Sequence, residues 1–160
     1  EGGTIYMDTV RIRDLTVGTQ KLAGGAVSSL AYNTGAGWVI DGAAVANILN
    51  CYVDMGSSLP GGQGVLIQSN MDFTSPDYSA GDTPIAQHLS IQIVRIRDNA
   101  ILRWLQVAGT DSRQALHINA FDPAPVTGSN GYQLRITNHS TGVVSTTMHT
   151  YDLIVQGAKR

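Results

Sequence analysis

The sequence predicts an all-β protein, mainly an antiparallel β-sandwich that is jelly-roll-like, and three observations predict it. Residues 88–107 alternate apolar and polar side chains around one short turn. Further strand-like runs recur with turn residues between them. Charged side chains make up 14% of the chain, against about 25% in ordinary soluble domains, so the surface is polar but uncharged, or another chain covers it.

Residues 1–30 differ from the rest, because only short apolar pairs stand between Thr, Asp, Gly and Gln. Gly18, Gly24 and Gly25 interrupt any helical stripe. Chains below about 40 residues rarely bury enough apolar surface alone and usually need metals, disulfides or oligomerisation. The segment holds neither cysteine nor a metal-ligand set. It is therefore predicted to oligomerise, with disorder as the alternative.

Residues 31–44 are predicted to be a linker, and residues 45–160 the β-sandwich domain. The linker is rich in glycine, and a first strand of the domain would open within it at residues 38–40. Gly35 and Gly37 lack both the third glycine and the βαβ context of a dinucleotide-binding loop. A turn or linker is the better interpretation of this glycine pair.

Within the domain we expect seven or eight strands, each with alternating inward and outward residues. They cover residues 45–55, 65–73, the two arms of 88–107, 115–121, 132–137 and 143–155, and a long loop spans 74–87. The residues expected to face the core are Val45, Leu49, Cys51, Val53 and Met55 in the first run; Val65, Ile67, Met71 and Phe73 in the second; and Tyr132, Leu134 and Ile136 in a later one.

The hairpin at residues 88–107 is the most strongly patterned stretch. Leu89, Ile91 and Ile93 alternate with polar residues on the first arm. Asp98 and the following asparagine tolerate the positive φ angles of tight turns. A 20-residue helix is the competing interpretation, and the density of β-branched residues argues against it. On the second arm, Trp104 is expected to pack in the core.

Composition excludes several classes of function. The net charge is −2 with no basic run, which argues against nucleic acid as a partner. Cys51 is the one cysteine, so no internal disulfide forms, and within an apolar run it is expected to be a small buried side chain. The sequence contains no run of 18 apolar residues, so no membrane-spanning helix is predicted. Because the chain opens at Glu1 without methionine, we expect a fragment of a longer protein.

No catalytic or metal-binding motif emerges, so the sequence predicts neither an enzyme nor a cofactor. The four histidines do not stand at metal-ligand spacing. Asp72, Asp77 and Asp82 lack the spacing of a calcium loop, and turn-forming roles suit them better. No serine lies in a Gly-x-Ser-x-Gly motif.

Exposed aromatic side chains are the best candidates for contact with a ligand. Tyr78 lies in the long polar loop between Asp77 and Asp82, and we predict that these three residues contact a receptor. Tyr52 is a further aromatic candidate.

Residues 11–28 resemble a segment of tailed-phage tail-tip proteins, the host-specificity or central tail-fibre proteins of lambda-like long-tailed phages. Leu15 to Leu22 and Ala23 to Val27 match two successive halves of the loose repeat of that family, although Gly24 stands where the family usually has aspartate. The resemblance implies a threefold-symmetric β-stalk over residues 1–30. The residues that would line its trimer axis are Ile12, Leu15, Val17, Leu22 and Val27.

The resemblance further implies an extracellular virion protein at the tail tip or central fibre. As a homotrimer beside other tail-tip proteins, it would bind a bacterial surface protein or glycan without catalysis and without inserting into the membrane. Two alternatives stay open. The chain would be an architectural spacer or trimerisation unit of the fibre, or it would be a carbohydrate-binding module of a secreted bacterial protein.

Overall fold

The computed structural model describes residues 29–56, 64–75, 89–140 and 145–157, which form eight antiparallel strands in two four-stranded sheets. The strands are β1 (Ser29–Ile40), β2 (Val45–Asp54), β3 (Val65–Ser75), β4 (Leu89–Arg95), β5 (Ala100–Val107), β6 (Thr110–Asp122), β7 (Ser129–Asn138) and β8 (Thr146–Gly157). The expected all-β sandwich is confirmed. The stalk predicted for residues 1–30, with its trimer-axis residues, lies outside the described residues apart from the last two, which begin β1.

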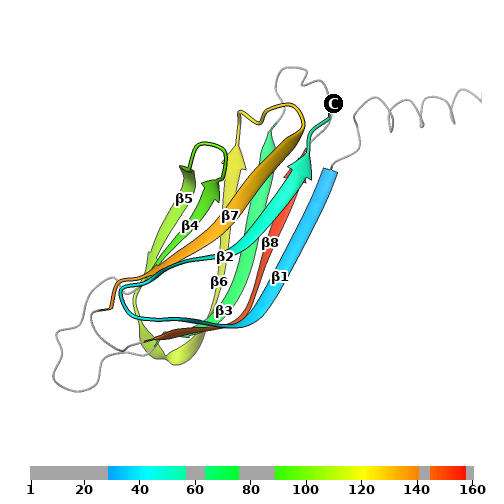
Figure 1. Cartoon of the computed structure of the whole chain (residues 1–160). Coiled ribbons are helices and arrows are strands. Elements are labelled where there is room, and N and C mark those ends of the chain that lie inside the picture. The colour runs from blue at the N-terminus through cyan, green and yellow to red at the C-terminus, as the bar shows by residue number, and fades with distance from the viewer. Residues whose placement is uncertain (1–28, 57–63, 76–88, 141–144, 158–160) are drawn as a thin grey trace, which may run out of the picture.

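The strand order is that of a jelly roll. One sheet runs β1-β8-β3-β6 and the other β2-β7-β4-β5. The strands pair as β1 with β8, β2 with β7, β3 with β6 and β4 with β5, as if one long antiparallel ribbon had been rolled up. Figure 1 shows the sheet that contains β2, β7, β4 and β5 lying over the other sheet.

The core lies between the two sheets and follows the predicted alternation. On β3, Val65, Ile67 and Phe73 are fully buried, and on β7 the same holds for Tyr132, Leu134 and Ile136. The predicted hairpin forms β4 and β5, with Leu89, Ile91 and Ile93 facing inward. Asn99 in its turn has a φ of 55°, which an asparagine tolerates better than most side chains.

The linker predicted for residues 31–44 is wrong, because most of it is strand. Residues 29–40 form β1, which pairs with β8 along its length, and a turn that includes Ala43 at a φ of 59° leads into β2. Glycine-rich sequence has low intrinsic strand preference. Here the pairing with β8, which is distant in sequence, decides the conformation of an edge strand.

Two core assignments are also wrong. Val45 is 61% exposed, because a register shift between Asn47 and Leu49 turns the start of β2 outward. Trp104 is 51% exposed, because β5 is the edge of its sheet and Trp104 pairs with Gln92 on the outer face. The exposed tyrosine expected at Tyr52 is present, at 56%.

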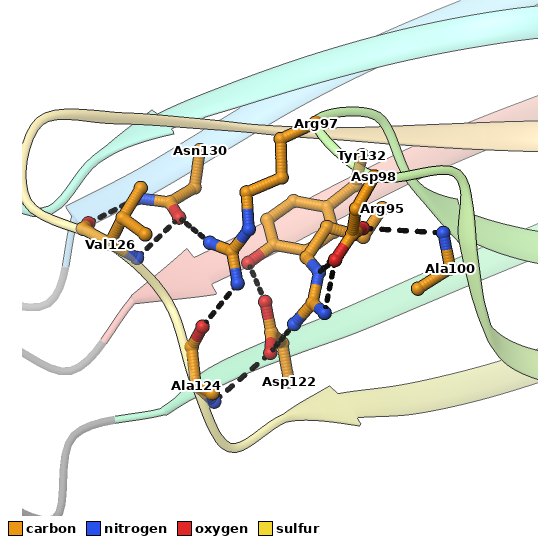
Figure 2. A network of polar contacts seen from close by, with 9 residues as sticks. All are labelled: Arg95, Arg97, Asp98, Ala100, Asp122, Ala124, Val126, Asn130 and Tyr132. Carbon is orange, nitrogen blue, oxygen red and sulfur yellow. Dashed lines mark hydrogen bonds and ion pairs between the residues drawn. The ribbon is translucent and has the colours of Figure 1, made fainter.

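A polar network holds one end of the sandwich (Figure 2), where the β4–β5 turn meets the β6–β7 loop. The buried carboxylate of Asp122 accepts hydrogen bonds from Arg95 Nη1 at 2.7 Å, the Tyr132 hydroxyl at 2.9 Å and the Ala124 N–H at 3.0 Å. Arg95 also pairs with Asp98 at 2.6 Å. Every one of these groups bonds to another within the network, so we regard it as structural and not as a binding site.

Asn130 and Arg97 extend the same network into the β6–β7 loop (Figure 2). The Asn130 amide accepts from the Val126 N–H at 2.9 Å and donates to the Val126 carbonyl at 2.7 Å. Arg97 donates to the Asn130 side chain at 3.2 Å and to the Ala124 carbonyl at 2.5 Å. These hydrogen bonds tie the β4–β5 turn to the β6–β7 loop.

Candidate binding groove

A groove of about 790 Å³ lies on the outer face of the β1-β8-β3-β6 sheet, with lining residues from all four strands. Pockets of about 300–1,000 Å³ are the usual size for small-ligand sites. Strand pairing explains the hollow, because it aligns one row of short side chains across the sheet. That row consists of Ala36, Thr150, Asp72 and Ala115.

The next row across the sheet is polar and consists of Thr34, Asp152, Asn70 and His117. Asn70 is its centre. Its backbone N–H donates to Asp152 Oδ1 at 2.6 Å, and its side-chain Nδ2 donates to Asp152 Oδ2 at 3.0 Å. Its Oδ1 lies 2.9 Å from His117 Nδ1. With the Asn70 amide oriented by Asp152, Nδ1 of His117 is the donor in that contact, and its Nε2 is an acceptor when the ring is neutral.

An ion pair borders the groove. Arg113 Nε lies 2.7 Å from each carboxylate oxygen of Asp72, and a second guanidinium nitrogen lies at 2.5 Å. The hydrogen bond from Arg113 lowers the pKa of Asp72, and the same bond raises the pKa of Arg113. Asp72 therefore stays ionised with its charge compensated. Next to it on the sheet, Thr74 Oγ1 hydrogen-bonds His149 Nε2 at 2.8 Å.

Tyr32 of β1 lines the other side of the groove and is 62% exposed. Its row continues through Ile154 and Gln68 to Asn119. Beyond it the sheet face becomes apolar, with exposed Leu30, Leu66 and Phe121. The groove thus combines one exposed aromatic ring with oriented polar groups.

The arrangement is suited to holding a ligand. In the part of the chain that the structure describes, no group of three His, Cys, Asp or Glu side chains is placed to hold a metal ion. Cys51 is buried in the core, and burial raises the pKa of its thiol. Across the same described ranges, no helix is long and apolar enough to cross a bilayer.

The residues predicted to contact a receptor, Asp77, Tyr78 and Asp82, lie outside the described residues. Tyr52, the further aromatic candidate, lies on β2 in the other sheet and does not line the groove. The turn-forming role expected for Asp72 is wrong, because Asp72 lies within β3 and pairs with Arg113. Because Val65, Ile67, Met71 and Phe73 are predicted to face the core, alternation leaves Asn70 and Asp72 on the outward face of their strand. The sequence did not bring these two residues together with Tyr32, His117 and Asp152. No local pattern signals that meeting, because strand pairing across 120 residues creates it.

The sequence matches no protein-family model and no curated protein sequence. In structure, the chain resembles VP2 of the infectious bursal disease virus subviral particle, with a TM-score of 0.52 and 13% identity over 82% of this chain and 33% of that one. It is less similar to FlhE, with a TM-score of 0.46 and 13% identity over 82% of this chain and 97% of that one. A carbohydrate-binding module, TmCBM61 in complex with β-1,4-galactotriose, has a TM-score of 0.37 and 8% identity, over 83% of this chain and 92% of that one. The likeness to VP2 supports the jelly-roll fold and nothing more specific.

Proposed function

We propose that this chain is a non-catalytic attachment domain of a tailed-phage tail tip or central tail fibre, and that the groove holds its receptor on the bacterial surface. The observation that carries the binding role is the groove itself. Its polar groups stand on paired strands and are oriented by one another, as in the contact of Asn70 with Asp152. Sites on strands hold side chains more precisely than sites on loops.

The phage assignment is supported by the resemblance of residues 11–28 to tail-tip proteins and by the jelly roll, a fold that viral capsid domains use. In the proposed virion protein, three chains join through Ile12, Leu15, Val17, Leu22 and Val27. Three grooves on one trimer would act together, because linked sites raise the effective concentration of each subsequent contact. The loop with Asp77, Tyr78 and Asp82 remains a second proposed contact.

Competition for adsorption tests the function. Excess purified chain, added to sensitive bacteria before the phage that encodes it, should lower the fraction of phage adsorbed. The Tyr32→Ala chain should compete less well, and the Tyr52→Ala chain should compete like the parent, because Tyr52 is a similarly exposed tyrosine on the other sheet. Unchanged adsorption with all three chains would contradict attachment and would favour the spacer function.

A carbohydrate-binding module of a secreted bacterial protein is the second candidate. The exposed ring of Tyr32 beside the polar row of the groove favours it, since an aromatic face and hydrogen-bonding groups suit a sugar. The two candidates differ in assembly. A chain that stays monomeric at micromolar concentration in light scattering, yet binds a glycan, would support the module and contradict the trimeric fibre.

A further inference from the structure

We propose that the groove takes an uncharged oligosaccharide, one without carboxylate, sulfate or phosphate groups. This inference rests on the proposed binding role of the groove and names its ligand class. Three features of the described residues lead to it: the unused hydrogen-bonding capacity of the polar row, the charge of the face, and the position of Tyr32.

The polar row offers mainly acceptors. Asn70 uses its amide N–H groups on Asp152 and its carbonyl oxygen on His117. What remains is lone pairs on the Asp152 carboxylate and Nε2 of His117, which accept, and the hydroxyl of Thr34, which both donates and accepts. A sugar hydroxyl supplies the donors that such a wall lacks. Phosphate, sulfate and carboxylate groups supply only acceptors.

The charge of the face points the same way. On this sheet face the described charged side chains within the groove are Asp72 and Asp152, and only Asp72 has a cation beside it. No ion pair joins Asp152 to a described Lys, Arg or His. An anionic ligand would therefore meet an uncompensated carboxylate in the middle of the groove, and like charges at close range repel. An uncharged ligand meets no such cost.

Tyr32 gives the groove a flat apolar surface for a sugar ring. It is 62% exposed and lines the same groove as Asp152 and Thr34. The register places Tyr32 two residues from Thr34 on β1, so both side chains leave the same face of the sheet. A pyranose lying against the ring would present its equatorial hydroxyls towards the polar row.

Binding of the full chain to defined oligosaccharides tests the inference. The probes are tetrasaccharides of uncharged hexoses and N-acetylhexosamines, together with hexuronic acid tetrasaccharides of the same length. Calorimetry or an immobilised panel should show binding to one or more uncharged members and at least tenfold weaker binding to the uronic acid counterparts. Tyr32→Ala and Asp152→Asn should each weaken that binding about tenfold.

Two control variants show whether a loss of binding is specific to the groove. Tyr52→Ala and Asp54→Asn change an exposed tyrosine and an aspartate on the other sheet and should leave affinity unchanged. Asp152 also accepts a backbone N–H, so its variant needs a thermal melt. Tyr32 is 62% exposed, so Tyr32→Ala is expected to cost little stability. No binding to any uncharged probe, equal binding to the uronic acid series, or parent-like affinity in Tyr32→Ala would each overturn the inference.

The test separates this inference from the proposed function. A chain that binds an uncharged glycan through Tyr32 but does not block phage adsorption would support the ligand class and contradict attachment. A chain that blocks adsorption equally well with and without the Tyr32→Ala change would support attachment and overturn the groove as its site.

Discussion

Asp122 is the residue on which one end of the sandwich depends. Its side chain is fully buried and accepts hydrogen bonds from the Arg95 guanidinium, the Tyr132 hydroxyl and the backbone N–H of Ala124. Burial, and then the hydrogen bond to Asp122, raises the pKa of Tyr132, so this hydroxyl stays protonated and donates. Three hydrogen bonds, one of them from a cation, offset the free-energy cost of removing this carboxylate from water.

Replacing Asp122 by asparagine should therefore destabilise the fold by about 3 kcal/mol, because a guanidinium and a hydroxyl would then face an amide that also donates. Urea denaturation measures the change. The control is Asp98→Asn, which removes the more exposed partner of Arg95 and should cost clearly less stability than Asp122→Asn, because solvent screens exposed ion pairs. Equal losses in the two variants would show that burial of Asp122 is not what matters.

Asp98 gives the fold a pH dependence at the acid end. The hydrogen bond from Arg95 lowers the pKa of Asp98 to about 2, whereas an aspartate in the unfolded chain has a pKa of about 3.9. A lowered folded pKa means stability that is present above about pH 4 and lost as the pH falls towards 2. Asp72 acts in the same direction through Arg113. Urea midpoints measured between pH 5 and pH 2 should fall, and less steeply in Asp98→Asn; identical slopes would contradict this role for Asp98.

At the scale of elements, the strands that sequence alone predicted are those with a strong internal alternation. The buried residues of β3 and β7 repeat every second position, and their faces were predictable for that reason. On β4 the apolar residues Leu89, Ile91 and Ile93 alternate in the sequence, although Ser90 and Val94 are buried too. β1 was missed as a strand over most of its length, and the outward face of β5 was misassigned at Trp104; both strands are sheet edges. An edge strand packs less, so glycines are tolerated in β1 and apolar residues such as Trp104 stay exposed on β5.

Gly35 shows what β1 requires of its sequence. It pairs with Tyr151, and a Cβ at Gly35 would overlap the ring of that tyrosine. Gly35→Ala should destabilise the protein by about 1–3 kcal/mol through overpacking. In a Tyr151→Leu background the same change should cost little, because the ring is gone. Thermal unfolding of the four chains gives the coupling energy, and additive losses would contradict the contact.

At the scale of the whole molecule, rolling the ribbon creates the groove. Tyr32, Asn70, His117 and Asp152 come from four strands spread along the chain, and only the pairing of β1, β8, β3 and β6 brings them onto one face. Of the four ribbon pairs, only β4 with β5 joins strands adjacent in sequence, and it was the one pairing that local pattern predicted. The low fraction of charged residues predicted a polar, uncharged surface. The arrangement of the groove residues on that surface depends on the register between strands that are distant in sequence.

Assembly into trimers should depend on residues 1–28, where the proposed axis residues lie. Because both sheets and the core between them lie within residues 29–157, a chain of residues 29–160 should fold alone, as a monomer, with unchanged urea stability per chain. The full chain should have the mass of three copies in light scattering, since the proposed axis residues lie before Ser29. Both should bind a single glycan with equal affinity, but the shortened chain should block phage adsorption at least 100-fold less effectively, because linkage of three grooves is lost. A monomeric full chain, or equal blocking by the two, would contradict the trimeric fibre while leaving the groove intact.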